Sequence, residues 1–336
     1  MAGVDVAVPC YQYGRYLRGC VSSVLSQEIQ DLRILIIDNA STDDSVEVAR
    51  QLAAEDRRVE VVAHQKNLGQ HASFNEAIDW AASDYFIILC ADDLLAPGSL
   101  RRACSIMEQH PDVNLTYGRV LTVSSSEAVP AIGLLAQDPQ WRILSGRELL
   151  ERFCRNGRCH IHPPTVVIRT SAQKQAGYYR PELPHSDDWE LWMRFACLGS
   201  VAETDTVQGI SINHSENRRS TVSNIHLWDL QFEAAFESFF AREGAFAPAA
   251  KGLRRIARRS LAERAYWSGV ANLLRGEGGL GLDLLAFAFT RSPKTIVVPP
   301  VGRLFRRDDA FSKITQVVSE AARRFRTPVG KNEVCQ

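Results

Sequence analysis

The chain has 336 residues, of which 45% are hydrophobic and 23% charged, and its formal net charge is zero. These values are ordinary for a soluble globular protein and leave room for one large or two modest domains. The N-terminus lacks the charged start and the long apolar core of a signal peptide. The most apolar late segments, 280–290 and 295–301, are shorter than the roughly 20 residues of a membrane crossing. Eight cysteines without an export signal favour reduced thiols and a cytoplasmic location.

The first third of the chain alternates between apolar runs and segments with helical spacing. We expect strands at 4–9, 32–37, 59–63 and 85–89, and helices at 16–27, 44–54, 71–82 and about 98–110. The β-branched and leucine run at 32–37, interrupted only by Arg33, is typical of a parallel strand that is buried on both faces. The alternation predicts an α/β fold with a mostly parallel central sheet flanked by helices.

The rest of the chain is less regular and then becomes helical. Residues 113–123 predict one long strand or a pair, 165–169 a strand, and 146–156 and 188–198 helices. Beyond about residue 224 the pattern is helical, with breaks at Pro248, 276–281 and Pro299-Pro300. We therefore expect an α/β domain at 1–223, with halves 1–110 and 111–223, and a helical C-terminal region at 224–336.

Acidic residues follow two strands of the predicted sheet. Asp38 follows the 32–37 strand, and Asp92 and Asp93 come directly after the 85–89 strand. An acid pair after a strand is more often a turn or helix cap than a functional site. However, ligands of parallel sheets bind beyond the carboxyl ends of the strands, where these acids fall. One acid can contact a nucleoside there, while the pair holds Mg²⁺ or Mn²⁺ against a diphosphate.

Several motifs follow one another between residues 4 and 220. In chain order they are Val-Pro-Cys-Tyr-Gln at 8–12, Ile-Asp-Asn-Ala-Ser-Thr-Asp at 37–43, Asn67-Leu68-Gly69 with Asn75, Ala91-Asp92-Asp93 with Pro97-Gly98, Pro164-Thr165, Asp-Asp-Trp-Glu-Leu-Trp-Met-Arg at 187–194, and His214. In this order and spacing they resemble the family 2 glycosyltransferases, an inverting group with a GT-A fold. The resemblance implies metal-dependent transfer of a sugar from a nucleotide sugar to an acceptor hydroxyl, in cell-surface polysaccharide, glycolipid or glycoconjugate biosynthesis.

The resemblance also implies roles for residues around the donor. Pro9, Tyr11 and Asp38 would contact the base of the nucleotide. Asn67 and Gly69 would shape the nucleotide pocket. A UDP-sugar is the expected donor, the acceptor would be a saccharide or a lipid-linked molecule, and no nucleic-acid partner is expected.

The metal site is implied by the same resemblance. Asp92 and Asp93 would form the acid motif, with Asp92 also near the nucleotide, Asp93 as the direct ligand of Mg²⁺ or Mn²⁺, and His214 close to the metal or diphosphate. The family's motif often begins with an Asp two residues before Asp92, where this chain has Cys90. Since a thiol is a poor ligand for Mg²⁺, we expect weak metal affinity in the absence of the donor.

The resemblance assigns the base to the acids at 187 and 188. Asp188 would deprotonate the acceptor hydroxyl, with Asp187 as the neighbouring acid. The like charges of Asp187 and Glu190 would raise the pKa of Asp188. Trp192 has core spacing, whereas Trp189 fits either the core or stacking on the acceptor.

The C-terminal region is basic: from Lys251 onward it has 17 Lys and Arg against 7 Asp and Glu. The basic residues include Arg254-Arg255, Arg258-Arg259, Arg306-Arg307 and Arg323-Arg324 with Arg326, with apolar residues such as Leu284, Leu285, Phe287 and Phe289 between them. One interpretation is a helical bundle packed on the catalytic domain, including a homodimer contact. The other is peripheral contact with anionic lipid on the inner face of the membrane.

Two further groups are weighed and set aside. Cys154, Cys159, His160 and His162 form a C-x4-C-H-x-H pattern, but the adjacent Cys-His pair suits a tetrahedral zinc site poorly. His71, near the expected donor pocket, is interpreted as a solvated residue at a helix start.

Two alternative functions stay open at this point. A nucleotidyltransferase that makes nucleotide sugars would need a Gly-rich basic loop after the first strand, where Pro9-Cys10-Tyr11 stands. A non-catalytic nucleotide-sugar-binding or membrane-associated scaffold is suggested by Cys90. The sequence has no Walker A motif, no Gly-x-Gly-x-x-Gly after a strand and no Gly-x-Ser-x-Gly, which argues against ATPases, dehydrogenases and α/β-hydrolases.

Overall fold

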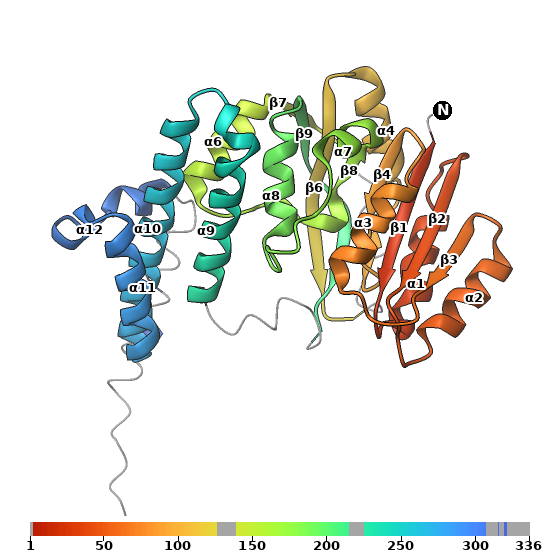
Figure 1. Ribbon diagram of the computed structural model, residues 1–336, viewed down its shortest axis with the longest axis horizontal. Helices are drawn as coiled ribbons and strands as arrows, with labels where there is room; N and C mark the ends of the chain where they lie inside the picture. Colours follow the sequence, from red (N-terminus) through yellow and green to blue (C-terminus); the bar gives the residue numbers. More distant parts are fainter. Residues whose placement is uncertain (1–2, 126–138, 215–224, 307–314, 316–318, 321–336) are drawn as a thin grey trace, which may run out of the picture.

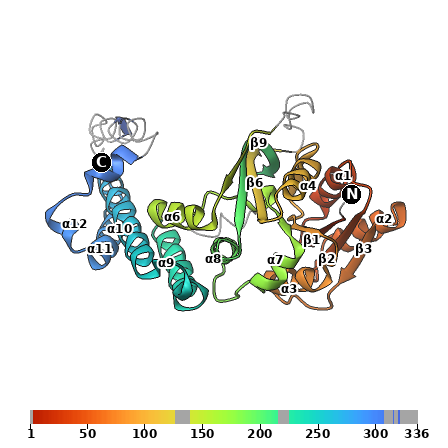
Figure 2. The same ribbon diagram turned by 90° about the horizontal axis from the view of Figure 1, so that it is seen from above.

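The computed structural model describes residues 3–125, 139–214, 225–306, 315 and 319–320. Its described residues form a large sheet with helices on both faces, and a group of C-terminal helices lies at one end of the molecule (Figure 1). Viewed from above, the same helices extend away from the sheet (Figure 2). This is the predicted α/β fold with a helical C-terminal extension.

The N-terminal part of the sheet is parallel, as the sequence predicts. β1 (Val4–Cys10), β2 (Leu32–Asp38), β3 (Val59–Ala63) and β4 (Tyr85–Ile88) lie in the order β3-β2-β1-β4. The intervening helices are α1 (Gly14–Leu25), α2 (Ser45–Glu55) and α3 (Gln70–Trp80). The sheet separates two apolar cores: Val6 of β1 packs in one and its neighbour Ala7 in the other. Burial on both faces explains why these strands are mostly apolar, with Asp5, Arg33 and Glu60 among the exceptions.

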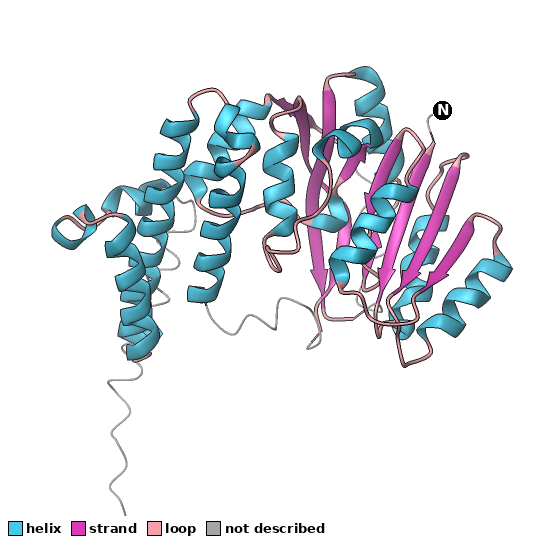
Figure 3. Ribbon diagram, viewed as in Figure 1, coloured by secondary structure: helices cyan, strands magenta, loops and turns pink. Residues whose placement is uncertain are grey.

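The second part of the sheet mixes strand directions. β8 (Val167–Arg169) lies antiparallel between β4 and β6 (Val113–Val123), and β6 pairs in parallel with β9 (Ser200–Ile212). β9 also pairs antiparallel with the short strands β5 (Asp93–Leu95) and β7 (Trp141–Leu144). Six of the nine strands in the described residues therefore run in one direction (Figure 3). Strands β5, β7 and β9 were not among the predicted elements, and residues 113–123 form one long strand.

Further helices cover this part of the sheet. They are α4 (Ser99–Gln109), α6 (Gly146–Asn156), α7 (Thr170–Ala176) and α8 (Asp187–Phe195), with a 3-10 turn η2 at Pro163–Thr165. α6 coincides with its predicted range because its ends are encoded locally: Ser145 and Glu148 form a capping box, and Gly157 ends the helix in the left-handed conformation.

The C-terminal helices pack on the sheet domain through an aromatic core. They are α9 (Ile225–Ala241), η4 (Glu243–Phe246), α10 (Ala250–Arg275), α11 (Gly278–Arg291), α12 (Lys294–Val297) and η5 (Val301–Arg306). Phe236 and Phe239 of α9 belong to the same buried cluster as Trp189 of α8 and Phe153 of α6. Among the described helices, none has both the length and the apolarity of a membrane crossing.

The structure tests the predicted packing of the apolar residues in this region, but it describes only some of the predicted basic residues. Leu284 and Phe287 are buried, which confirms packing for these apolar residues. Of the basic residues named in the prediction, Arg307, Arg323, Arg324 and Arg326 lie outside the described residues.

Candidate active site

The acids that follow β2 and β4 reach the same edge of the sheet. β1 pairs in parallel with β2 on one side and with β4 on the other, so the three strands end together (Figure 1). Cys10 at the end of β1 is in register with Asp38 at the end of β2. The structure thus brings Asp38 and the turn after β4 to one edge, which is the placement that the sequence predicts.

Asp38 keeps one carboxylate oxygen available. Its side chain is fully buried, and the Ser41 N–H donates to Oδ2 at 2.9 Å. Its Oδ1 atom is buried and has no hydrogen-bond partner among the described residues. A buried carboxylate oxygen without a donor is unfavourable, so this atom is suited to accept a hydrogen bond from a ligand.

The loops after β1 and β2 hold each other in an uncommon backbone conformation. Gln12 and Ala40 have φ angles of 61° and 62°, in the left-handed region that non-glycine residues rarely adopt. The Gln12 N–H donates to Ser41 Oγ at 2.9 Å, and its side-chain amide donates to Thr42 Oγ1 at 2.8 Å. Tyr11 beside them is 45% exposed, which leaves its ring open to a ligand. Such strained loops cluster at binding sites.

Asn67 and Gly69 shape the next loop, which leads from β3 to α3. Asn67 Oδ1 accepts hydrogen bonds from the Gly69 N–H at 2.8 Å and from the Asn39 side-chain amide at 3.0 Å. Asn39 Oδ1 in turn accepts from the Leu68 N–H at 2.8 Å. Gly69 has a φ of 81°, which favours glycine. Asn39, which lies in the 37–43 motif but was given no role from the sequence, therefore connects the β2 loop to this one.

Cys90, Asp92 and Asp93 form a compact group after β4. Their ligand atoms lie within 4.8 Å of one another, and within the described residues this is the one group of three or more His, Cys, Asp and Glu side chains so placed. The Asp93 N–H donates to the Cys90 carbonyl at 2.9 Å, which closes the turn. His214 Nε2 lies 3.2 Å from Asp92 Oδ2 and thereby joins the group from the end of β9. Two buried carboxylates at this spacing fit a divalent cation.

Aromatic rings hold His214 in place. Its ring stacks on Tyr16 at a centroid distance of 4.8 Å and meets Tyr13 edge-on at 5.5 Å. Both tyrosines come from the start of α1, directly after the β1 loop. Packing against Tyr13 and Tyr16 thus holds His214 next to the group formed by Cys90, Asp92 and Asp93.

The set at 154–162 does not form a metal site. His160 Nε2 lies 3.2 Å from the Tyr117 hydroxyl, and Cys159 Sγ contacts the Ile161 carbonyl at 3.4 Å. Burial lowers the pKa of His160 to about 4 and raises the pKa of the Cys154 thiol to about 12. In the structure His160 and Cys159 thus make separate contacts within the packing.

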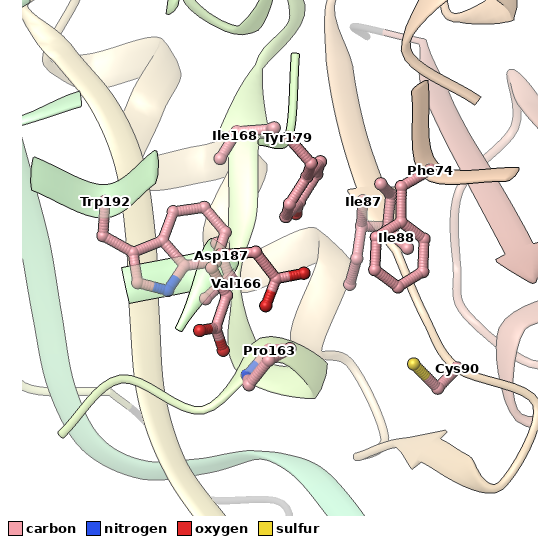
Figure 4. Close-up of a pocket in the computed structure, with 11 residues that line it drawn as sticks. Phe74, Ile87, Ile88, Cys90, Pro163, Val166, Ile168, Tyr179, Asp187 and Trp192 are labelled. Carbon is pink, nitrogen blue, oxygen red and sulfur yellow. The ribbon is translucent and has the colours of Figure 1, made fainter. Parts of the chain in front are cut away.

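The acids of α8 lie in a pocket that also contains Cys90. The pocket has a volume of about 80 Å³ and is lined by Phe74, Ile87, Ile88, Cys90, Pro163, Val166, Ile168, Tyr179, Asp187, Asp188 and Trp192 (Figure 4). In Figure 4 the Asp187 carboxylate and the Cys90 sulfur both point toward the interior of the pocket. Asp187 and Asp188 of α8 and Cys90 of the group after β4 therefore line the same pocket.

The two α8 acids have different partners. Asp187 is buried, and its Oδ2 lies 2.9 Å from His71 Nε2. Asp188 is less buried, and its Oδ1 accepts a hydrogen bond from the Trp189 N–H at 2.6 Å. The interpretation of His71 as a solvated residue was wrong, because its side chain is 14% exposed and bonded to Asp187. A pair 116 residues apart leaves no local signal in the sequence.

The structure also decides the open alternatives at positions 189–192. Trp189 is fully buried, with Phe232 and Phe236 of α9 at centroid distances of 4.8 and 4.7 Å, so it is a core residue. Trp192 is 3% exposed and packs in the core as expected, but it also lines the pocket. Glu190 is buried between Arg180 and Arg194, which compensate its charge.

Comparisons with known proteins agree with this geometry. The model of the family described as Glycosyl transferase family 2 matches residues 5–174, which is half of the chain. An uncharacterised glycosyltransferase of Methanocaldococcus jannaschii is 24% identical over 213 residues, which cover 63% of this chain and 70% of that protein. A chondroitin synthase of Pasteurella multocida is 32% identical over 214 residues, which cover 64% of this chain and only 21% of the synthase.

Solved structures show the same fold. TarS residues 1–349 of S. aureus, in complex with UDP-GlcNAc, aligns with a TM-score of 0.64 and 16% identity over 96% of this chain and 92% of that one. The mannosyltransferase PcManGT of Pyrobaculum calidifontis, in complex with GDP-Man and Mn²⁺, aligns with a TM-score of 0.55 and 15% identity over 96% and 86%. With the family match, the nucleotidyltransferase and scaffold alternatives are set aside: the chain belongs to glycosyl transferase family 2 and is a glycosyltransferase with a GT-A fold.

Proposed function

We propose that this glycosyltransferase moves a sugar from a nucleotide-sugar donor, foremost a UDP-sugar, to a hydroxyl of a saccharide or lipid-linked acceptor. The product would belong to cell-surface polysaccharide, glycolipid or glycoconjugate biosynthesis. The observation that carries the proposal is the single pocket shared by Cys90, Asp187 and Asp188 at the edge where the acid group lies. The UDP-GlcNAc complex of TarS and the chondroitin synthases support the donor and the product class.

In this proposal the first half of the chain, residues 1–110, holds the donor. Asp38 Oδ1 accepts an N–H of the base, since it is buried and lacks a partner among the described residues. Pro9 and Tyr11 border the base, and Asn67 and Gly69 keep the β3–α3 loop in shape. The rigid contacts between these loops favour a preformed nucleotide pocket.

Asp93 and Asp92 hold Mg²⁺ or Mn²⁺ in this proposal, and His214 orients Asp92 through their hydrogen bond. The Mn²⁺ complex of PcManGT supports a divalent cation in this class of fold. When bound, such an ion supplies charge neutralisation at the departing diphosphate. Buried carboxylates beside a pocket are the donors that these hard cations prefer.

Residues 111–223 hold the acceptor and supply the base. Asp188 accepts the proton of the acceptor hydroxyl while that oxygen bonds to the anomeric carbon. The bond from this carbon to the diphosphate breaks on the opposite face, so the configuration inverts. Asp188 is the better base of the pair because Asp187 is buried and bonded to His71. General base catalysis typically contributes about 10²–10⁴-fold.

The helical region, residues 224–336, is proposed to bring the enzyme to the inner face of the membrane, where a lipid-linked acceptor would lie. Lys251, Arg255 and Arg258 form an exposed basic row on α10. Ile296 and Val297 of α12 are 62% and 81% exposed. Basic and apolar side chains together favour anionic lipid surfaces. Sedimentation with anionic vesicles at low and high salt tests this, and a homodimer without vesicle binding would reject it.

A thermal-shift screen of UDP-, GDP- and dTDP-sugars, with and without Mn²⁺, tests the proposed function. A ligand that binds only the folded state raises the melting temperature. We expect one UDP-sugar to give the largest shift, and the shift to require Mn²⁺. The anomeric configuration of the product, measured by NMR, then tests inversion. A protein that neither binds nor hydrolyses any nucleotide sugar would contradict the proposal.

A further inference from the structure

The position of Cys90 gives it a fixed backbone and a side chain at the pocket. Its carbonyl accepts hydrogen bonds from the Asp93 N–H at 2.9 Å and from the Cys20 thiol at 3.6 Å. The preceding residue, Leu89, still donates to Ala7 of β1 at 2.9 Å. The thiol is therefore presented by a well-determined turn at a strand end, and in Figure 4 its sulfur points into the pocket.

The donor set at this turn contains sulfur as well as oxygen. The Cys90 Sγ atom and one oxygen each of Asp92 and Asp93 lie within 4.8 Å of one another, which is close enough for a single ion to reach all three. Asp92 is in addition held by His214. A histidine that orients a ligating carboxylate is a frequent outer-shell arrangement in metal sites.

Sulfur changes which ions such a set prefers. Carboxylate and water ligands suit Mg²⁺ and Mn²⁺, whereas thiolate ligands select Zn²⁺ and softer cations. Zinc accepts mixed sulfur, nitrogen and oxygen ligands at short distances. An all-carboxylate set would show a smaller preference for zinc, so a thiolate at position 90 would add to the selectivity of the site.

We propose that the Cys90 thiolate, with the carboxylates of Asp92 and Asp93, forms a sulfur–oxygen site that binds zinc-class cations more tightly than Mg²⁺ or Mn²⁺. On binding, the thiol releases its proton to solvent and the sulfur bonds to the ion. The inference rests on the proposed function only in taking this turn as the cation site.

The test uses the full chain with Cys159, Cys197 and Cys335 replaced by Ser, which removes thiols that would bind metal adventitiously. Cd²⁺ serves as the probe, because its bond to a thiolate gives an ultraviolet charge-transfer band. We expect this parent protein to develop the band at one equivalent of Cd²⁺. Calorimetry should then rank Zn²⁺ and Cd²⁺ above Mn²⁺ and Mg²⁺.

Substitutions at position 90 give the decisive comparison. Cys90→Ser should lose the band and weaken Cd²⁺ binding by at least about tenfold, since loss of even an outer-shell partner costs about 10–100-fold. Cys90→Asp should lose the band and narrow the gap in affinity between Cd²⁺ and Mn²⁺ or Mg²⁺, because an oxygen ligand replaces the sulfur. Cys104→Ser, which removes a buried thiol of α4, should keep the band. Circular dichroism and melting temperature check the folding of each variant.

Two results would overturn the inference: no band in the parent protein, or an unchanged band in Cys90→Ser. The donor screen separates this failure from failure of the proposed function. If Mn²⁺-dependent binding of a nucleotide sugar persists while the cadmium band is absent, only the sulfur site is wrong. If neither any cation nor any nucleotide sugar binds, both proposals are wrong.

Discussion

His71 Nε2 lies 2.9 Å from Asp187 Oδ2, and this contact joins α3 to the first turn of α8. Both side chains are largely buried, with exposed fractions of 14% and 4%. The contact fixes the carboxylate that precedes the proposed base in the chain. His71 is therefore a positioning residue in the proposed mechanism, acting on Asp188 through its neighbour.

Replacing His71 by Ala should lower kcat by about 10–100-fold, because a hydrogen bond to a charged group is typically worth about 1.5–3 kcal/mol. The KM for the donor should change little, and His71→Gln should restore part of kcat. His110→Ala, at the end of α4, is the matched control and should behave like the unmodified enzyme. Steady-state kinetics that show a raised donor KM with unchanged kcat would assign His71 to donor binding instead.

Replacing Asp188 by Asn should reduce transfer by about 10²–10⁴-fold, the usual contribution of a general base. Donor binding, measured by thermal shift, should stay nearly intact because Asp188 is proposed to act on the acceptor. Asp205→Asn changes an exposed acid of β9 in the same way and serves as the control. Near-normal turnover of the Asp188 variant would show that another group accepts the proton.

Replacing Asp38 by Ala should weaken donor affinity by about tenfold or more, since it removes the buried acceptor Oδ1. The loss should be similar for different sugars on the same nucleotide, because the contact is to the base. Calorimetric titration of UDP and of the UDP-sugar measures this directly. A variant that binds both ligands as tightly as the unmodified protein does would exclude Asp38 from the nucleotide pocket.

Asp5 should contribute stability that depends on pH. It is buried, and although burial raises its pKa, hydrogen bonds from Arg33, Ser83 and Ala82 lower the pKa below its ordinary value of 3.8. A lowered pKa stabilises the fold above 3.8, and this contribution is lost as the pH falls through the folded-state value. Asp5→Asn should cost about 1.5–3 kcal/mol at neutral pH, the range for hydrogen bonds to a charged group, because Arg33 is 37% exposed and the ion pair is partly screened by solvent.

Urea unfolding of both proteins over a range of pH checks this expectation. The difference between Asp5→Asn and the unmodified chain should shrink below pH 3.8. Glu55→Gln, which removes an exposed ion pair with Arg18, should show no comparable difference. A constant difference at all pH values would mean that the charge of Asp5 is not responsible.

Replacing Gly69 by Ala and replacing Gly252 by Ala should change the stability of the chain in opposite directions. A Cβ atom at Gly69 or at Gly252 would meet nothing within 4 Å, so steric contact is the same in both. Gly69 has a φ of 81°, and Gly69→Ala should destabilise the chain by about 1–2 kcal/mol. Gly252 lies inside α10, where Gly252→Ala should stabilise by up to about 1 kcal/mol. Equal melting temperatures would contradict the backbone explanation.

The sequence predicted the parts of the fold whose signals are local. The strand at 32–37 is apolar except for Arg33 because it is buried on both faces, and α6 carries its own cap at Ser145. β9 was missed because its 13 residues mix polar and apolar side chains, and its pairing with β5, β6 and β7 is decided by distant segments.

The candidate site also has parts that could be predicted from the sequence and parts that could not. Asp38, Asp92 and Asp93 follow strands, so their common edge could be inferred from the parallel alternation alone. The partners that orient the site come from far along the chain, as with His71 and Asp187 or Asn39 and Asn67. Residue type and spacing contain no record of such contacts, which arise only when the elements pack.

Trp189 follows the proposed base in the chain, and its indole is enclosed by Phe232 and Phe236 of α9. The first turn of α8 thus depends on helices that lie beyond residue 224. A truncation that kept the whole sheet but ended before α9 would remove the two phenylalanines that pack against Trp189, next to the proposed base. The smallest active unit is therefore expected to be larger than the family-matched segment, and exchanging C-terminal helices between relatives should change the rate of transfer.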